Sequence, residues 1–239
     1  MRGRREAPVG VVVALTVVSG MIDAVTFLRF GQVFTANMTG NVIVLGFATG
    51  GMPGFSAAGS VVSLAAFLAG AVAGGRVGRT AGGRRVLMAL GVETVAVAVA
   101  AGVARWVDGA EVAGGWRYAV VGVLAAAMGL QGATVRLLAI PDVTGSVLTR
   151  ILTGLAAQSP LGGGGDRLAA RRVAAVACMF LGALGGALLV RHAGVPWTLT
   201  AVAVYLVAVA AAHAAWQARA RHRRPEVDSS RGDGGEHEG

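Results

Sequence analysis

The first long apolar stretch of the chain, residues 8–28, reads PVGVVVALTVVSGMIDAVTFL, and it decides the fold. Its length matches the roughly 20 helical residues that cross the hydrocarbon core of a bilayer. Arg2, Arg4 and Arg5 precede it, as in a signal peptide, but no small-residue cleavage site ends it. We therefore interpret it as a retained first membrane helix.

The rest of the chain has the same character. Hydrophobic residues make up 55% of its 239 residues and charged residues only 14%, with a mean hydropathy of +0.67. A soluble domain carries about 25% charged residues, so lipid is the expected solvent and the bilayer the expected partner. Five more stretches are long enough to span it: Phe55 to Gly75, Val86 to Ala104, Tyr118 to Ile140, Val173 to Val190 and Trp197 to Trp216.

Two shorter apolar pieces, Val33 to Thr49 and Val143 to Ala157, each contain a Thr-Gly pair and are either full crossings or re-entrant segments. Arginine placement favours the second reading, because short cytoplasmic loops accumulate positive charge. If neither piece crosses, all four basic clusters fall on one side: Arg2, Arg4 and Arg5; Arg76, Arg79, Arg84 and Arg85; Arg167, Arg171 and Arg172; Arg219, Arg221, Arg223 and Arg224.

The predicted fold class is therefore an all-α membrane protein with about six transmembrane helices and two broken or re-entrant segments. The first segment is expected to enter from outside and the second from inside. We expect a multi-pass protein of the cytoplasmic (inner) membrane with both termini in the cytoplasm. One membrane domain covers residues 1–217, and residues 218–239, basic and then acidic and Gly-rich, form a predicted disordered cytoplasmic tail.

The two halves of this domain, about 8–104 and 118–216, resemble each other. SGMIDA (19–24) corresponds to MGLQGA (128–133), and TGN (39–41) to TGS (144–146), at offsets of 109 and 105 residues. Three spans per half is an odd number, so duplication would place the halves in opposite orientations. The sequence predicts an inverted 3+3 repeat; chance similarity between Gly/Ala/Val-rich helices is the alternative.

Three strings of residues carry a resemblance to a known family: GMIDAVTFL (20–28), VFTANMTGN (33–41) and GLQGA (129–133). They resemble the YoaK or DUF1275 family of bacterial integral membrane proteins of unknown function. The resemblance covers roughly residues 9–215, and FTANMTGN is its specific part. The second Thr-Gly site, VTGS (143–146), departs from the family pattern. The resemblance implies about six spans and supplies no substrate.

Two carboxyl groups lie within predicted spans, Asp23 and Glu93. A charged side chain at membrane depth costs about 2.5–3.5 kcal/mol even on the lenient insertion scale, so each needs a partner, a cavity or a proton. The functional reading is a proton-coupling or cation-contacting group. The alternative is a structural carboxyl that fixes helix packing.

The first short piece opens with alternating polar residues before an apolar run from Val42, and Thr, Asn and Gly cap helix starts. A helix start at membrane depth directs unpaired N–H groups into any cavity that it faces. An anion or polar solute could bind there; a structural helix break is the alternative. With the carboxyl groups and the matching second-half residues, the candidate substrate-binding or translocation residues are Asp23, Thr35, Asn37, Thr39, Gly40, Asn41, Glu93, Gln131, Thr144, Gly145 and Ser146.

Other function classes find no support in the residues. The basic residues are dispersed between apolar runs, which speaks against nucleic-acid binding. One cysteine and four scattered histidines give no metal-ligand spacing, and no nucleophile has an evident base partner. We expect no enzyme, metal or cofactor. The sequence predicts a transporter or channel for a small solute or ion, with a non-transporting scaffold or accessory subunit as the alternative; it names neither substrate nor oligomeric state.

Overall fold

The computed structural model describes residues 3–80, 84–107, 115–137, 148–159 and 169–222. Within these ranges every regular element is a helix. In chain order they are α1 Gly3–Arg29, α2 Met38–Thr49, α3 Ala57–Thr80, α4 Arg85–Val107, α5 Gly115–Leu137, α6 Leu148–Ala157 and α7 Ala169–His222. The predicted all-α membrane class is confirmed.

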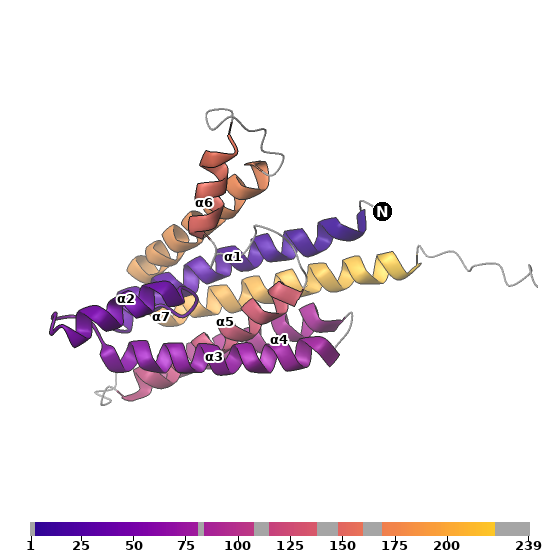
Figure 1. Cartoon of the computed structure of the whole chain (residues 1–239). Coiled ribbons are helices and arrows are strands. Elements are labelled where there is room, and N and C mark those ends of the chain that lie inside the picture. Colours follow the sequence, from indigo (N-terminus) through magenta and orange to yellow (C-terminus); the bar gives the residue numbers. More distant parts are fainter. Residues whose placement is uncertain (1–2, 81–83, 108–114, 138–147, 160–168, 223–239) are drawn as a thin grey trace, which may run out of the picture.

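Five of these helices are long and apolar enough to cross a membrane: α1, α3, α4, α5 and α7. The last has 54 residues, which at 1.5 Å per residue would make it far longer than a bilayer core is thick. Gly194 divides it, with φ 82° and ψ 172°, two residues before Pro196. Its two arms diverge in Figure 1 and contain the predicted spans 173–190 and 197–216.

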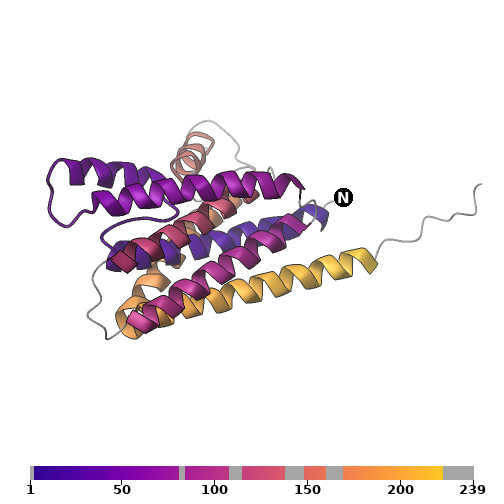
Figure 2. The same cartoon turned by 90° about the horizontal axis from the view of Figure 1, so that it is seen from below.

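The first short piece forms α2, a helix of 12 residues and therefore about 18 Å long, too short to cross the roughly 30 Å bilayer core. It lies beside α3 at the end of the bundle where α1 finishes and α3 begins (Figures 1 and 2). The chain turns at Gly31 and Gln32, both with positive φ, before it reaches α2. The helix begins at Met38, four residues earlier than the run from Val42 that the sequence suggested, because Asn37 caps it.

The second short piece is only partly described. Its C-terminal part forms α6, which packs on the start of α7. Thr144, Gly145 and Ser146 lie outside the described residues, as do the end of the predicted fourth span after Leu137 and the tail from residue 223. The described part of α7 continues to His222, six residues beyond the predicted end of its span.

Glycine allows two close helix crossings. A Cβ on Gly182 of α7 would meet the backbone carbonyl of Val17 in α1, and one on Gly70 of α3 would meet that of Ala126 in α5. Only Gly lets backbones approach this closely. The two crossings have equivalent contacts. A residue of α1 corresponds to the residue 109 positions later in α5, and a residue of α7 corresponds to the residue 112 positions earlier in α3. The matched contacts are Gly20 with Met179 and Gly129 with Phe67, Val17 with Gly182 and Ala126 with Gly70, and Met21 with Gly186 and Leu130 with Gly74.

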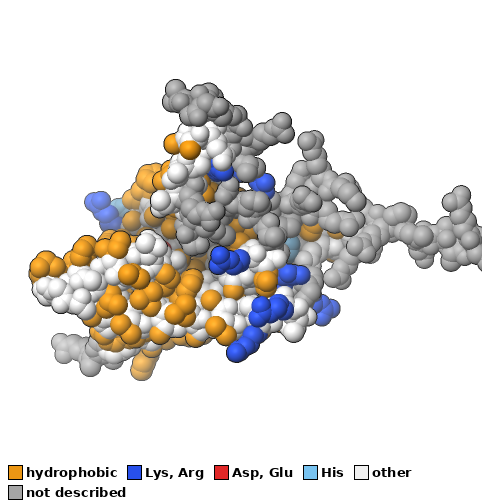
Figure 3. Space-filling model, in the orientation of Figure 1, with side chains coloured by type: hydrophobic (Ala, Val, Ile, Leu, Met, Phe, Trp, Pro, Cys, Tyr) orange, Lys and Arg blue, Asp and Glu red, His pale blue; other side chains and the backbone are white. Residues whose placement is uncertain are grey.

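The outer surface suits lipid. Large apolar side chains are exposed along α3, α4 and α7, among them Val61, Leu68, Val95, Phe180 and Leu181. Figure 3 shows apolar side chains over much of the face along α3, with basic side chains gathered towards the end where that helix finishes. Polar side chains, in contrast, lie buried between the helices. This inversion of the soluble pattern follows from lipid as the solvent.

Candidate functional site

Asp23 anchors the loop between α1 and α2. Its Oδ1 accepts hydrogen bonds from the backbone N–H of Thr35 and of Ala36, both at 2.8 Å, and from the Thr35 hydroxyl at 3.2 Å. The side chains of Asp23 and Thr35 are buried, and Oδ2 of Asp23 has no hydrogen-bond partner among the described residues. The structure thus brings two of the predicted site residues together, and they hold an extended stretch of backbone against α1.

Asn41 holds the same loop from the other side. Its Oδ1 accepts from the Phe34 N–H at 2.8 Å, and its Nδ2 donates to the Phe34 carbonyl at 2.6 Å and to Ser63 Oγ at 3.0 Å. The Ser63 hydroxyl donates to the same carbonyl at 2.6 Å. Asn41 and Ser63 are fully buried. Helices α1, α2 and α3 thus contribute to one hydrogen-bonded network, which we call the latch: the side chains of Asp23, Thr35, Asn41 and Ser63 with the backbone of Phe34 to Ala36. Buried backbone groups in lipid need such partners.

Asn37 and Gly40 shape the start of α2. The Asn37 side chain accepts a 3.3 Å hydrogen bond from the Gly40 N–H, which caps the helix. A Cβ on Gly40 would lie 2.7 Å from the Phe34 ring, so any larger residue would have to displace that ring. Thr39 and Gly40 therefore stand in the first turn of the helix, beside the latch.

Glu93 and Gln131 form a second polar group between α4 and α5. Glu93 is fully buried, and the two oxygens of its carboxyl group lie 2.8 and 3.0 Å from one terminal atom of the Gln131 amide. The other end of that amide lies 3.5 Å from Ser19 Oγ in α1. Ser19 also donates to the Leu15 carbonyl at 3.0 Å and lies 4.0 Å from Met128 Sδ. Three helices thus meet through polar side chains in the interior.

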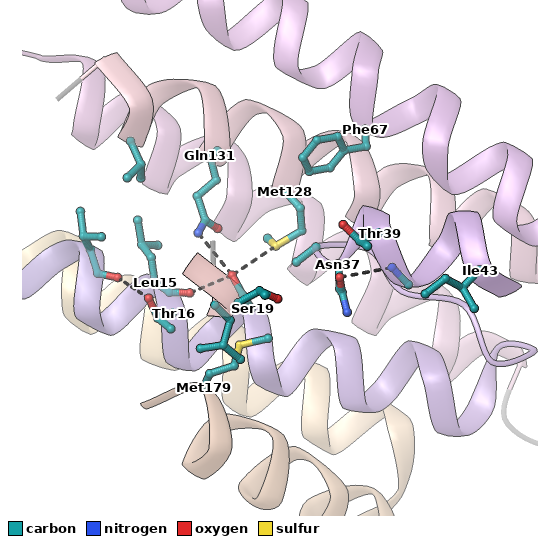
Figure 4. A pocket seen from close by; sticks show the side chains of 17 residues that line it. Leu15, Thr16, Ser19, Asn37, Thr39, Ile43, Phe67, Met128, Gln131 and Met179 are labelled. Carbon is teal, nitrogen blue, oxygen red and sulfur yellow. Dashed lines mark hydrogen bonds between the residues drawn. The ribbon is translucent and has the colours of Figure 1, made fainter. Parts of the chain in front are cut away.

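A cavity of about 320 Å³ adjoins both groups. Figure 4 shows Ser19, Met128 and Gln131 converging on one side of it and Asn37 and Thr39 on the other. It is lined mainly from α1, α2 and α5, with Leu148 and Thr149 of α6 and single contributions from Phe67 of α3 and Met179 of α7. The polar side chains of its described lining are all neutral: Thr16, Ser19, Asn37, Thr39, Gln131 and Thr149.

The predicted residues therefore separate into groups. Asn37, Thr39, Gly40 and Gln131 line the cavity, Asp23, Thr35 and Asn41 build the latch behind its wall, and Glu93 reaches it through Gln131. No hydrogen bond joins Asp23 to Glu93. Thr144, Gly145 and Ser146 lie outside the described residues.

Sequence reasoning missed Thr16, Ser19 and Ser63. Each is a hydroxyl inside an apolar helix, where it can satisfy itself by bonding the carbonyl one turn earlier, as Thr16 does to Val12 and Ser19 to Leu15. Composition alone cannot tell such a residue from one with a long-range partner. The polar-in-apolar signal that selected Gln131 could have found Ser19 and Ser63.

The arrangement offers hydrogen-bonding groups beside apolar side chains. Among the described residues no group of three His, Cys, Asp or Glu side chains stands close enough to hold a metal ion. The cavity offers hydroxyl and amide groups beside methionine, leucine and phenylalanine side chains. Such a lining suits a ligand with a polar group on an apolar body.

Comparisons with known proteins agree with a membrane protein. UPF0700 transmembrane protein YoaK of Bacillus subtilis (strain 168) is 28% identical over 145 residues, which cover 59% of this chain and 62% of that protein. The chain thus aligns with somewhat less than two thirds of that relative's length. No solved structure matches. Residues 11–212 match the family described as "Protein of unknown function (DUF1275)", which takes in the helices that carry the latch, the Glu93–Gln131 group and the cavity, and the chain belongs to this family of transmembrane proteins.

Proposed function

We propose that the protein is a membrane transporter or channel for a small solute, which binds in the cavity between α1, α2 and α5. The observation that carries this proposal is a cavity of about 320 Å³, lined by hydrogen-bonding groups, inside a bundle of membrane-spanning helices. A cavity of this size holds a small organic molecule. Polar residues within a bundle that face a cavity are typical of solute pathways.

The lining favours an uncharged solute over an ion. None of the described side chains on the wall carries a formal charge, and a bare ion in a low-dielectric site needs a countercharge or many dipoles. Hydroxyls and amides at Ser19, Thr39 and Gln131 can both donate and accept hydrogen bonds. A neutral molecule with one or two polar groups and an apolar body matches this chemistry.

The proposal includes an inverted repeat as its structural basis. The shared register of the α1–α7 and α3–α5 crossings supports a duplication, and α1 and α5 run in opposite directions in both cartoon views. The cavity lies between the two halves, since α1 and α2 line one side and α5 the other. Transporters built from inverted repeats bind substrate at the repeat interface and alternate access there.

The same proposal places both termini and the arginine clusters in the cytoplasm, with the membrane in question the inner membrane. Labelling of a cysteine introduced by Gly51→Cys tests this orientation, because Gly51 lies in the connection from α2 to α3 and Cys178→Ala removes the natural thiol. A membrane-impermeant maleimide should label it from outside. Labelling from the cytoplasmic side alone contradicts the proposed topology.

Filling the cavity tests the function. A Cβ on Gly132 would meet only Phe67 Cζ, at 3.9 Å, so the first carbon of a side chain fits there and Gly132→Leu adds bulk to the cavity. Gly185→Leu is the matched control, because a Cβ there has no neighbour within 4 Å. A neutral solute that binds wild type should raise its unfolding free energy by about 2.7 kcal/mol at a hundred times its dissociation constant.

We expect Gly132→Leu to lose the stabilisation and the uptake of that solute into proteoliposomes, and Gly185→Leu to keep both. If a broad panel of neutral solutes stabilises neither wild type nor the control, the proposed site is wrong. Equal binding by all three proteins places the solute elsewhere.

The alternative function is a membrane scaffold or accessory subunit, which the latch favours. The latch side chains form their hydrogen bonds within the protein and not with a ligand: Asp23, Thr35, Asn41 and Ser63. A scaffold needs no accessible cavity, so Gly132→Leu would leave its assembly with partners unchanged.

A further inference from the structure

Glu93 has surroundings unlike those of any other described carboxyl group. It is fully buried on α4, and among the described residues its only hydrogen-bonding neighbour is the Gln131 amide of α5. Against α4 pack also α7 and the end of α3. The titratable or charged side chains on these neighbours are Arg76 and Arg79 of α3 and Tyr205, His213 and Arg219 on the second arm of α7. In the described part of the chain none of them forms a hydrogen bond or ion pair with Glu93.

The Gln131 amide fits this site in two orientations. With Nε2 towards Glu93, it donates to the carboxylate oxygens at 2.8 and 3.0 Å, and this is the orientation that an ionised Glu93 needs. With Oε1 towards Glu93, the same distances bring two acceptors together unless the carboxyl group carries a proton to donate. The two ends of an amide have nearly the same shape, so an ionised Glu93 selects the Nε2 orientation, and only a protonated Glu93 permits the Oε1 orientation.

We propose that Glu93 is a proton-binding site whose occupancy reverses the hydrogen-bonding character of the cavity wall through the Gln131 amide. Gln131 and Ser19 both line the cavity, and the amide end that faces away from Glu93 lies 3.5 Å from Ser19 Oγ. When Glu93 binds a proton from the medium, it donates that proton to Gln131 Oε1, and Nε2 points to Ser19 as a donor. When the proton leaves, the amide turns and presents Oε1 to Ser19 as an acceptor. No covalent bond other than the carboxyl O–H forms or breaks.

The Ser19 hydroxyl can serve both states, because a hydroxyl donates one hydrogen bond and accepts others. It accepts from Nε2 in the protonated state, while its own proton bonds the Leu15 carbonyl at 3.0 Å. In the ionised state that proton can turn to Gln131 Oε1. Asp23 cannot act in this way, because its partners include two backbone N–H groups, which never become acceptors.

If the cavity binds a solute as proposed above, this switch makes the preferred solute depend on pH. A solute with acceptor groups fits the protonated state, and one with donor groups fits the ionised state. The inference in this part rests on the proposed function. The proton site itself does not, and it can be tested on the purified full-length protein with no solute present.

Infrared difference spectra between acid and alkaline pH provide the first test. A carboxylic acid C=O band present at acid pH should disappear from the Glu93→Gln variant and persist in Thr94→Val, its neighbour on α4. Gln131→Leu keeps the carboxyl group and should keep the band. Spectra of Glu93→Gln that match those of wild type overturn the proposal.

A thiol at the far end of the amide tests the reversal. Cys178 is the only cysteine, so Ser19→Cys in a Cys178→Ala background gives one S–H stretch to follow. We expect the position of this band to change between acid and alkaline pH, because the thiol donates to the Leu15 carbonyl in the protonated state and to Gln131 Oε1 in the ionised state. Adding Glu93→Gln or Gln131→Leu should abolish the shift. A band that is independent of pH in the unmodified Glu93 background overturns the reversal, whether or not a solute is found for the cavity.

Discussion

Asp23 and Glu93 are two buried carboxyl groups on membrane-spanning helices, and their partners differ in kind. Asp23 Oδ1 receives two backbone N–H groups and a hydroxyl from a loop next in sequence. Glu93 meets one side-chain amide from a helix far along the chain. Fixed donors hold one arrangement, whereas an amide can turn. For a carboxyl group at membrane depth, whether its partners can change from donor to acceptor is thus a better guide to its role than its charge.

The first experiment removes the acceptor of the backbone N–H groups that bind Asp23. Asp23→Ala leaves the N–H groups of Thr35 and Ala36 without an acceptor, and each lost buried bond of this kind costs about 1–3 kcal/mol. We expect the free energy of unfolding in mixed micelles to fall by about 3–5 kcal/mol. Asp23→Asn is the control, because its side-chain oxygen can still accept both bonds, and most of the stability should return. Equal losses in both variants would show that the charge, not the acceptor, matters at this position.

The second experiment removes the other side of the latch. Asn41→Ala deprives Phe34 of a donor and an acceptor partner, and we expect a loss of about 2–3 kcal/mol in the same assay. Asn37→Ala, which removes only an exposed cap bond of 3.3 Å, should cost about 1 kcal/mol. If Asn37→Ala proves the more damaging change, α2 depends on its cap rather than on the latch.

The third experiment has the smallest expected effect on stability. It gives the most direct comparison of Glu93 with Asp23. Glu93→Gln is nearly isosteric and offers Gln131 both a donor and an acceptor, so unfolding should change by less than about 1 kcal/mol. Its stability should also lose the dependence on pH that Glu93 confers on wild type. A loss as large as that of Asp23→Ala would make Glu93 a structural group like Asp23.

The sequence predicted much of this fold because lipid imposes simple rules. Length and hydropathy placed the spans, and Asp23, Asn41 and Gln131 stood out as polar residues in apolar surroundings. The partner of each was harder to predict. Ser63 meets Asn41, and Ser19 approaches Gln131 from 112 residues away, because helix packing brings them together. Helix propensity and hydropathy contain no information about such pairing.

Boundaries of helices followed local chemistry rather than hydropathy. The apolar run starts at Val42, yet α2 begins at Met38, because the Asn37 side chain can satisfy the N–H of Gly40. Similarly, hydropathy divides α7 into two spans, and the structure places the break at Gly194, where only a glycine readily adopts the required positive φ.

The glycine crossing between α1 and α7 has a consequence for synthesis on the ribosome. Gly20 meets Met179, so 159 residues separate the partners, and at roughly 5–20 residues per second α1 waits about 8–30 s for α7 to emerge. Gly70 meets Ala126 only 56 residues later, so α3 and α5 can pair first. Until its loop partners are made, the Asp23 side chain would face lipid or the insertion machinery. Thr35 and Ala36 emerge within seconds of it, so the loop that anchors on Asp23 can shield the carboxyl group before its helix finds its final neighbour.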